Sequence, residues 1–325
     1  MPDTIRVQTR LWRTYRRLDP GRLTAEDPAV GADLGLGRLQ GRTALALGVY
    51  SRAGLEYALR QYGTLGKLEA RGLGRIDVQL ELADPFRPRI RLEGRAFPGR
   101  PCVEVEVRQT SGAEVGFPEA LARAPMLYVE SLLLQHPGGR FDWSRPRLPE
   151  QQFPGLSLSQ EILQLLLLLA KRVGSEALAL RPSSFHAAWV YARYFRFVDG
   201  RAQGRFESLR SDPRLRPLWV LSWALELDCV RRNGERVGFS PDPMAAPLSR
   251  RVAAHFARPR WLRMRSRGRS DRHALDLACL RARFPWESMP RGEPPASIRA
   301  LLRPPRGTRG AAGPRVGGHD YSRGG

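Results

Sequence analysis

Five consecutive leucines, at positions 165–169, lie inside the apolar segment 158–173. Together with Leu163 they place apolar side chains on every side of a helix, and a surface helix would expose several of them to water. The segment therefore predicts a helix that is buried over most of its surface. Such a helix needs other elements to cover it, and a chain of 325 residues is long enough to build that core.

Strands are predicted on both sides of this helix. Apolar and polar residues alternate over residues 76–82, as in a half-buried strand, and a helical pattern precedes them over residues 42–73. After the leucine-rich helix, an Asn-Gly pair at residues 233–234 predicts a hairpin turn. The further strands are expected at 87–92, 102–107, 126–134, 176–180, 195–198 and 218–230, with a second helix at 185–194. This succession predicts an α+β fold.

Cysteine and histidine positions narrow the function classes. The three cysteines, at positions 102, 229 and 279, are far apart, which speaks against a disulfide framework, a CxxC redox pair or a zinc ribbon. The five histidines form no HExxH motif, so no metal site is expected. No apolar run approaches the roughly 20 residues that cross a bilayer, and no apolar leader follows the N-terminus. We therefore expect a cytoplasmic protein with no membrane partner.

The positive charge is large and uneven. The formal net charge is +22, and 52 of the 54 basic residues are arginine. Residues 250–325 hold 18 arginines and five acidic residues, or +13 of the total. Proline and glycine dominate beyond residue 285, which predicts disorder. A GC-rich genome would itself favour arginine. The alternative is weak, non-specific nucleic-acid binding by residues 250–323, with arginines pairing phosphates and Trp261 stacking on a base.

The order strand, proline-rich loop, helix, strand, helix, strand over residues 126–198 resembles the core of the GNAT acyltransferase superfamily. The loop reads Gln-Phe-Pro-Gly-Leu-Ser at residues 152–157, and the family's loop reads Gln/Arg-x-x-Gly-x-Gly/Ala. Gln152 and Gly155 match, whereas Ser157 and Ser159 stand where small residues or glycine are frequent. The resemblance implies a mixed sheet flanked by helices. It also implies that the backbone at a helix N-terminus holds the pyrophosphate of acetyl-CoA or another acyl-CoA. The implied coenzyme-binding residues are Gln152, Phe153, Pro154, Gly155, Leu156, Ser157, Leu158 and Ser159.

The same resemblance suggests a catalytic acid. In the family, a tyrosine near the end of the second helix protonates the departing thiolate, and Tyr191 is its nearest counterpart here, with Tyr194 as the second choice. The family's Gly-Phe pair after this tyrosine is missing. Glu130 lies inside an apolar strand, so it is either paired with an arginine or able to act as the base that accepts the acceptor's proton. His186 is expected to be a capping or surface residue.

These patterns divide the chain into an N-terminal arm with helical character (residues 1–40), a GNAT-like α+β domain (41–245) and an arginine-rich, largely disordered tail (246–325). The first functional hypothesis is an acyl-CoA-dependent N-acyltransferase of unknown amine acceptor. The second is a non-catalytic binding or regulatory module built on the same fold. The third is a nucleic-acid-associated protein that acts through its tail.

Overall fold

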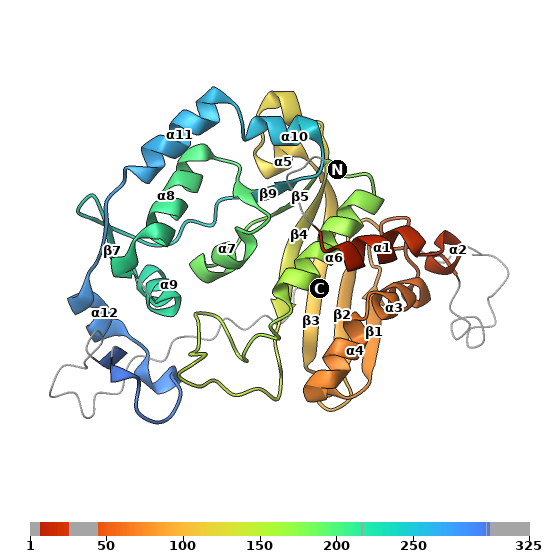
Figure 1. Cartoon of the computed structure of the whole chain (residues 1–325), viewed down its shortest axis with the longest axis horizontal. Helices are drawn as coiled ribbons and strands as arrows, with labels where there is room; N and C mark the ends of the chain where they lie inside the picture. Colours follow the sequence, from red (N-terminus) through yellow and green to blue (C-terminus); the bar gives the residue numbers. More distant parts are fainter. Residues whose placement is uncertain (1–6, 26–44, 216, 297, 300–325) are drawn as a thin grey trace.

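The computed structural model describes residues 7–25, 45–215, 217–296 and 298–299. A seven-stranded sheet with the order β1-β2-β3-β4-β5-β9-β6 runs through the centre of the molecule (Figure 1). Neighbouring strands are antiparallel except β4 and β5, which are parallel. Helices flank this sheet, and a smaller sheet has the order β10-β7-β8. The α+β class and the mixed sheet are therefore confirmed.

The strands follow the predicted alternation closely up to residue 197. Their bounds are β1 Ile76–Glu81, β2 Arg89–Gly94, β3 Pro101–Ser111, β4 Pro125–Leu134, β5 Ala177–Leu180, β6 Arg196–Phe197, β7 Val230–Arg232, β8 Glu235–Val237, β9 Met244–Pro247 and β10 His273–Leu275. The Asn-Gly turn joins β7 to β8, and both of its residues have positive φ angles.

The helices lie in three groups along the chain. Those before the sheet are α1 Thr9–Arg17, α2 Pro20–Leu23, α3 Arg52–Gln61 and α4 Thr64–Leu68. Those between strands are α5 Gly112–Val115, α6 Ser159–Arg172, α7 Phe185–Tyr191, α8 Gly200–Ser211 and α9 Leu218–Glu226. Those after β9 are α10 Arg250–His255, α11 Pro259–Arg269 and α12 Leu277–Arg283. The predicted N-terminal arm contains α1 and α2, and residues 1–6 and 26–40 of it lie outside the described residues.

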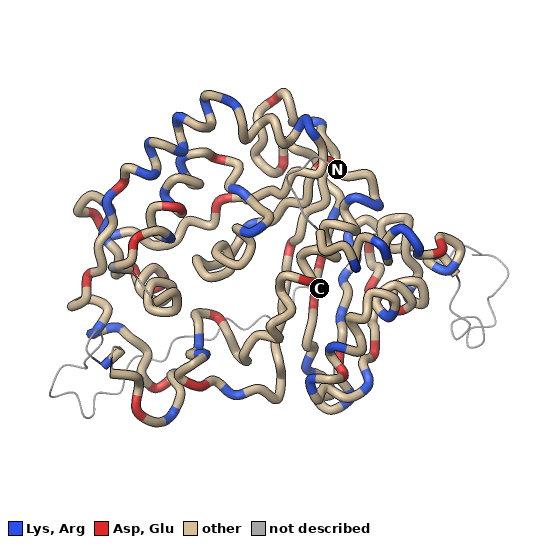
Figure 2. Tube along the Cα trace, in the orientation of Figure 1, with Lys and Arg blue, Asp and Glu red and all other residues tan. Residues whose placement is uncertain are grey.

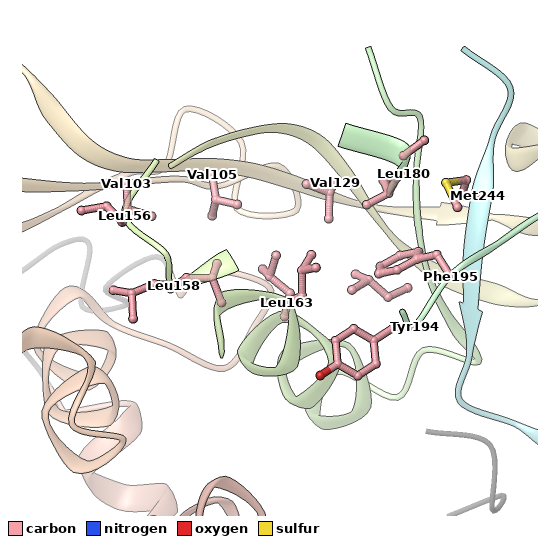
Figure 3. Packing of buried hydrophobic residues seen from close by; sticks show 14 of the residues in the cluster. Val103, Val105, Val129, Leu156, Leu158, Leu163, Leu180, Tyr194, Phe195 and Met244 are labelled. Atoms are coloured by element: carbon pink, nitrogen blue, oxygen red, sulfur yellow. The ribbon is translucent and has the colours of Figure 1, made fainter. Parts of the chain in front are cut away.

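Helix α6 is the central helix of the core, as the leucine run predicts. Leu163 and Leu167 are fully buried, and Leu166 and Leu168 are nearly so. Figure 3 shows Leu163 below Val105, Val129 and Leu180 of the sheet, with the ring of Tyr194 beside the helix. Leu165 and Leu169 are only partly buried, and both line a cavity of about 90 Å³ between α3, α6 and strands β2 and β3.

The opposite face of β1–β4 is charged and largely ion-paired. Arg89 reaches Glu106 at 2.8 Å, and Arg91 reaches Glu104 at 3.1 Å. The hydrogen bond from Arg89, and after it the one from Arg87 and the charges of both arginines, lower the pKa of Glu106 against the effect of burial. Glu104 and Glu106 alternate along β3, which is compatible with a solvated or an arginine-paired strand face, and the structure shows the arginine-paired one.

The predicted strand at residues 218–230 is wrong. The structure has helix α9 over most of it, and only Val230 belongs to a strand. Val220 and Ala224 are fully buried, and Leu221 and Leu225 are nearly so; these two pairs have the four-residue spacing of one helical face. A continuous apolar run contains both periods, so alternation alone could not decide between them.

The expected disorder of the C-terminal segment is wrong for residues 246–296. Strand β9 crosses the predicted boundary at residue 245 and pairs with both β5 and β6. Helix α11 buries Trp261, whose Nε1 donates to the Val198 carbonyl at 3.1 Å, so this ring cannot stack on a base. Apolar residues at helical spacing, such as Val252 and Phe256, are what order the segment. Residues 300–325 lie outside the described residues.

The cysteine prediction also needs a correction. Cys229 and Cys279 form a disulfide with a Cα–Cα distance of 5.5 Å. They are 50 residues apart in sequence. Pairing of β10 with β7 brings their segments together, and such a contact has no local signature in the sequence.

Candidate coenzyme site

The pairing between the parallel strands β4 and β5 stops at the carboxyl end of β5. They are paired from Met126 with Ala177 to Val129 with Leu180, where β5 ends. Strand β4 continues for five more residues to Leu134 and is paired there only with β3. The carboxyl ends of parallel strands meet at one edge of a sheet, which is where open α/β sheets bind ligands. The long connection from β4 to α6 leaves from this edge.

The connection folds back beside the end of β4. The amide of His136 donates to the Pro154 carbonyl at 2.7 Å. A Cβ built on Gly155 would meet only the Leu134 carbonyl oxygen, at 3.8 Å, so this glycine is exposed and has space around it. The backbone here is therefore accessible to a ligand, as a phosphate-binding loop requires.

The eight predicted coenzyme-binding residues do not all face the same space. Pro154, Gly155 and Ser157 line an open groove of about 300 Å³. Leu156 and Leu158 point into the hydrophobic core, so only their backbones could contact a ligand. Gln152 and Phe153 lie outside the groove walls, and Ser159 is the first residue of α6. The other groove residues are Phe141, Arg145, Pro146, Leu148, Gln151, Leu218 and Trp219.

The N-terminus of α6 supplies further polarity beside the groove. Its N-cap residue, Leu158, has no side-chain cap, so the first amides of the helix have no side-chain acceptor there. The positive end of the helix dipole and Arg145 in the groove wall both favour an anionic ligand. Arg71 adds a cation nearby, since its Nε donates to the Leu156 carbonyl at 3.1 Å.

Tyr191 is held at the same end of α6. The Nε2 of Gln160, in the first turn of α6, donates to the carbonyl of Val190 at 3.2 Å. This bond ties the end of α7, which includes Tyr191, to the helix start. Burial raises the pKa of Tyr191 to about 12, so its phenol keeps its proton at neutral pH. Tyr194 is more deeply buried and packs with Phe195 in the core (Figure 3).

Glu130 is not brought together with Tyr191. Its neighbours on β4, Leu127 and Val129, face the core under α6, and the alternation of the strand turns Glu130 to the other side. There Arg108 forms an ion pair with it, and the same arginine reaches Glu114 at 2.7 Å. The arginine-paired alternative fits this geometry, and the role as catalytic base does not.

Several polar residues gather near the carboxyl end of β5, and the sequence did not predict that they lie together. Ser183 Oγ donates to Glu150 Oε2 at 2.9 Å, which joins the start of α7 to the loop. Burial, together with the carboxylates of Glu150 and Asp228, raises the pKa of Glu226. Burial lowers the pKa of His186 to about 4. These residues come from three separate segments, so no spacing in the sequence could have grouped them.

Comparisons with known proteins leave the chain unassigned. No family model matches the sequence, and no curated protein matches it. Over the described ranges, no cluster of three or more histidine, cysteine, aspartate or glutamate side chains could hold a metal ion. In the same part of the chain, no helix combines the length and apolar character needed to span a bilayer.

Proposed function

We propose that this protein is an acyl-CoA-dependent N-acyltransferase whose coenzyme lies along the groove at the carboxyl ends of β4 and β5. The observation that carries the proposal is the end of pairing in this parallel pair, where β5 stops and β4 continues, with the exposed Gly155 and the uncapped start of α6 beside it. The order β4, loop, α6, β5, α7, β6 also matches the order of strands and helices in the GNAT core.

Three residues outside the groove wall, on segments next to it, would supply the groups that acyl transfer to an amine needs. A bound acyl-CoA would supply the activated thioester carbonyl, and the exposed backbone at Gly155 would hold its pyrophosphate. Tyr191 would donate its proton to the departing sulfur as the C–S bond breaks and the C–N bond forms. Glu150 and Glu226 would attract a cationic acceptor and take up the proton that its nitrogen loses. Ser157 and Ser159, in place of smaller family residues, leave the helix start open but narrow the space beside it.

A thermal-shift titration with acetyl-CoA tests the proposal. Ligand that binds only the folded state raises the melting temperature, by an amount that grows with concentration. Gly155→Glu should abolish the rise, because its carboxylate would occupy the phosphate position. Gly66→Glu is the matched control, since Gly66 is also exposed with nothing within 4 Å of a built Cβ, but lies on α4. No rise with the unchanged protein at millimolar coenzyme would favour the non-catalytic module instead.

A second candidate function is polyanion binding by α11. Arg258, Arg260, Arg263 and Arg267 are exposed, and none of them forms an ion pair within the described ranges. Figure 2 shows the basic positions following one another along this helix. Arg265 differs, because Glu207 of α8 holds it at 2.9 Å. A rigid row of free guanidinium groups favours contact with a phosphate backbone.

A further inference from the structure

Strand β1 forms a free edge of the main sheet. In the described part of the chain it is paired only with β2, and it lies at the end of the sheet opposite β6 (Figure 1). The pairing with β2 is regular over all six residues of β1, which contains no proline, lysine or bulge. Natural sheets use such features to protect their edges, because an unprotected edge pairs with another chain.

The backbone of three residues points away from the sheet at this edge. The amide of Arg95 donates to the Arg75 carbonyl at 3.0 Å, which fixes the phase of the pairing between β1 and β2. The odd-numbered residues of β1 therefore exchange hydrogen bonds with β2. The amides and carbonyls of Ile76, Val78 and Leu80 point outward instead, and they have no hydrogen-bond partner within the described ranges.

An open groove of about 610 Å³ runs along these outward groups. Residues 75–80 line it together with Arg52 and Glu56 of α3 and Arg95 after β2. Both odd-numbered and even-numbered residues of β1 take part, so the groove lies along the edge and not on either face of the sheet. An extended chain therefore has access to the outward amides and carbonyls.

A second copy of β1 is complementary to this edge. When two β1 strands run antiparallel with Val78 opposite its own copy, Ile76 lies opposite Leu80, and every outward amide and carbonyl gains a partner. In the same register, Arg75 of each chain lies opposite Glu81 of the other, and opposite charges at such positions stabilise a pair of strands. Arg75 is exposed and forms no ion pair within the described ranges, and the nearest described cation to Glu81 is 3.6 Å away.

We propose that two copies of this chain form a dimer through antiparallel pairing of their β1 strands, which joins the two main sheets into one. Ile76 and Val78 belong to the core that α3 covers, so the apolar row of β1 continues from one chain into the other. Between the charged pairs Asp77 lies opposite Gln79, so no like charges face each other. The interface is separate from the coenzyme groove and does not depend on the acyltransferase proposal.

Sedimentation velocity of the full chain over a range of concentrations measures the Kd of this dimer. Arg75→Glu places a carboxylate opposite Glu81 at both ends of the interface and should raise the Kd about tenfold or more. The double variant Arg75→Glu/Glu81→Arg exchanges the two charges and should return the Kd to within about threefold of its original value. Arg13→Glu is the control, because this exposed arginine on α1 undergoes the same charge change away from β1 and should leave the Kd unchanged.

The variant Val78→Pro gives a second readout. The amide of Val78 points away from β2, so proline removes no hydrogen bond within the chain but removes one from each side of the dimer. This variant should sediment as a monomer and keep the far-ultraviolet circular dichroism of the unchanged protein. The proposal would be overturned if the unchanged protein stays monomeric up to about 100 μM, or if Arg75→Glu and Arg13→Glu change the Kd equally.

Discussion

Burial lowers the pKa of His186 to about 4, and this gives the protein a defined response to acid. In the unfolded chain a histidine has a pKa of about 6.5, so the unfolded state binds this proton more readily. The contribution of His186 to stability is therefore complete above about pH 6.5 and is lost as the pH falls toward 4. A shift of this size corresponds to about 3 kcal/mol when it is lost in full.

The variant His186→Gln should remove this response. Between pH 7 and pH 4.5, the urea midpoint of the unchanged protein should fall further than that of the variant, because glutamine binds no proton. His255 and His273 are also present in the variant, so their own lowered pKa values cancel in the difference. Parallel pH profiles for the two proteins would show that the environment of His186 does not penalise its charge.

Individual side chains were predicted only where their neighbours in the sequence fix their surroundings. Glu130 could be recognised as unusual, but its direction depends on which face of β4 the core occupies, and its partner Arg108 comes from β3. Gly155 and Tyr191 were selected through the resemblance. The link between them, from Gln160 to Val190, joins two helices and has no local pattern.

At the scale of single elements, α6 makes the strongest prediction. Leu167 is fully buried in the core, and Leu167→Ala should reduce the free energy of unfolding by about 2–5 kcal/mol through lost burial and a new cavity. Leu262→Ala is the control, because Leu262 is 43% exposed on α11 and should change stability by less than about 0.5 kcal/mol. Chemical denaturation followed by circular dichroism measures both, and equal effects would contradict the buried position of α6.

Helices α8 and α11 cross in close contact at glycines. A Cβ built on Gly204 would lie 2.1 Å from the Arg265 carbonyl oxygen, and one on Gly268 would lie 2.2 Å from that of Arg201. Gly204→Ala should destabilise the protein by about 1–3 kcal/mol, although alanine is the better helix former, because the two backbones must separate. Gly66→Ala on α4 has free space and should stabilise by about 0.5–1 kcal/mol. If alanine stabilises the protein at both Gly204 and Gly66 in thermal denaturation, the backbones of α8 and α11 do not contact each other as closely as the structure indicates.

Elements with a distinct period were predictable, and elements without one were not. The strands β1, β3 and β4 and the helices α6 and α7 follow from alternation or from leucine content. Helix α9 was predicted as a strand, because its apolar run fits both the two-residue period of a strand and the 3.6-residue period of a helix. Helices α10 and α11 were missed because arginine composition concealed the apolar positions that bury Val252, Phe256 and Trp261.

At the scale of the whole molecule, the disulfide joins the segment after α9 to α12 across 50 residues. Closing a loop of this length stabilises by about 4 kcal/mol in the chain-entropy treatment. A reducing agent should therefore lower the melting temperature of the unchanged protein, while the variant Cys279→Ser should melt lower and be insensitive to reductant. Disulfides are rare in reducing compartments such as the cytoplasm, so this bond argues against the predicted cytoplasmic location. The location stays a prediction.

The row of free arginines on α11 predicts a salt-dependent affinity for polyanions. Replacing both Arg263 and Arg267 by glutamine should weaken binding to single-stranded nucleic acid and to heparin, and should reduce the slope of log K against log salt by about 1–2. Arg265→Gln is not a suitable control, because Glu207 holds that side chain. The double variant Arg13→Gln/Arg16→Gln on α1 is the matched one, because both arginines are exposed and neither forms an ion pair within the described ranges. If the slope of log K against log salt, measured by fluorescence anisotropy, is unchanged in the Arg263 and Arg267 variant, the arginines of α11 do not contact the polyanion and reflect only the arginine-rich composition of the chain.

The place of β9 in the sheet determines when the protein can fold during its synthesis. In the main sheet β6 is paired only with β9, and β5 needs β9 to cover its second edge. Yet β6 ends at Phe197 and β9 begins at Met244. At 5–20 residues per second, the ribosome takes roughly 2–9 s to make the intervening chain. During that interval the nascent protein has an unpaired strand edge beside its leucine-rich helix. This edge can pair with another chain until β9 has been synthesised and covers it.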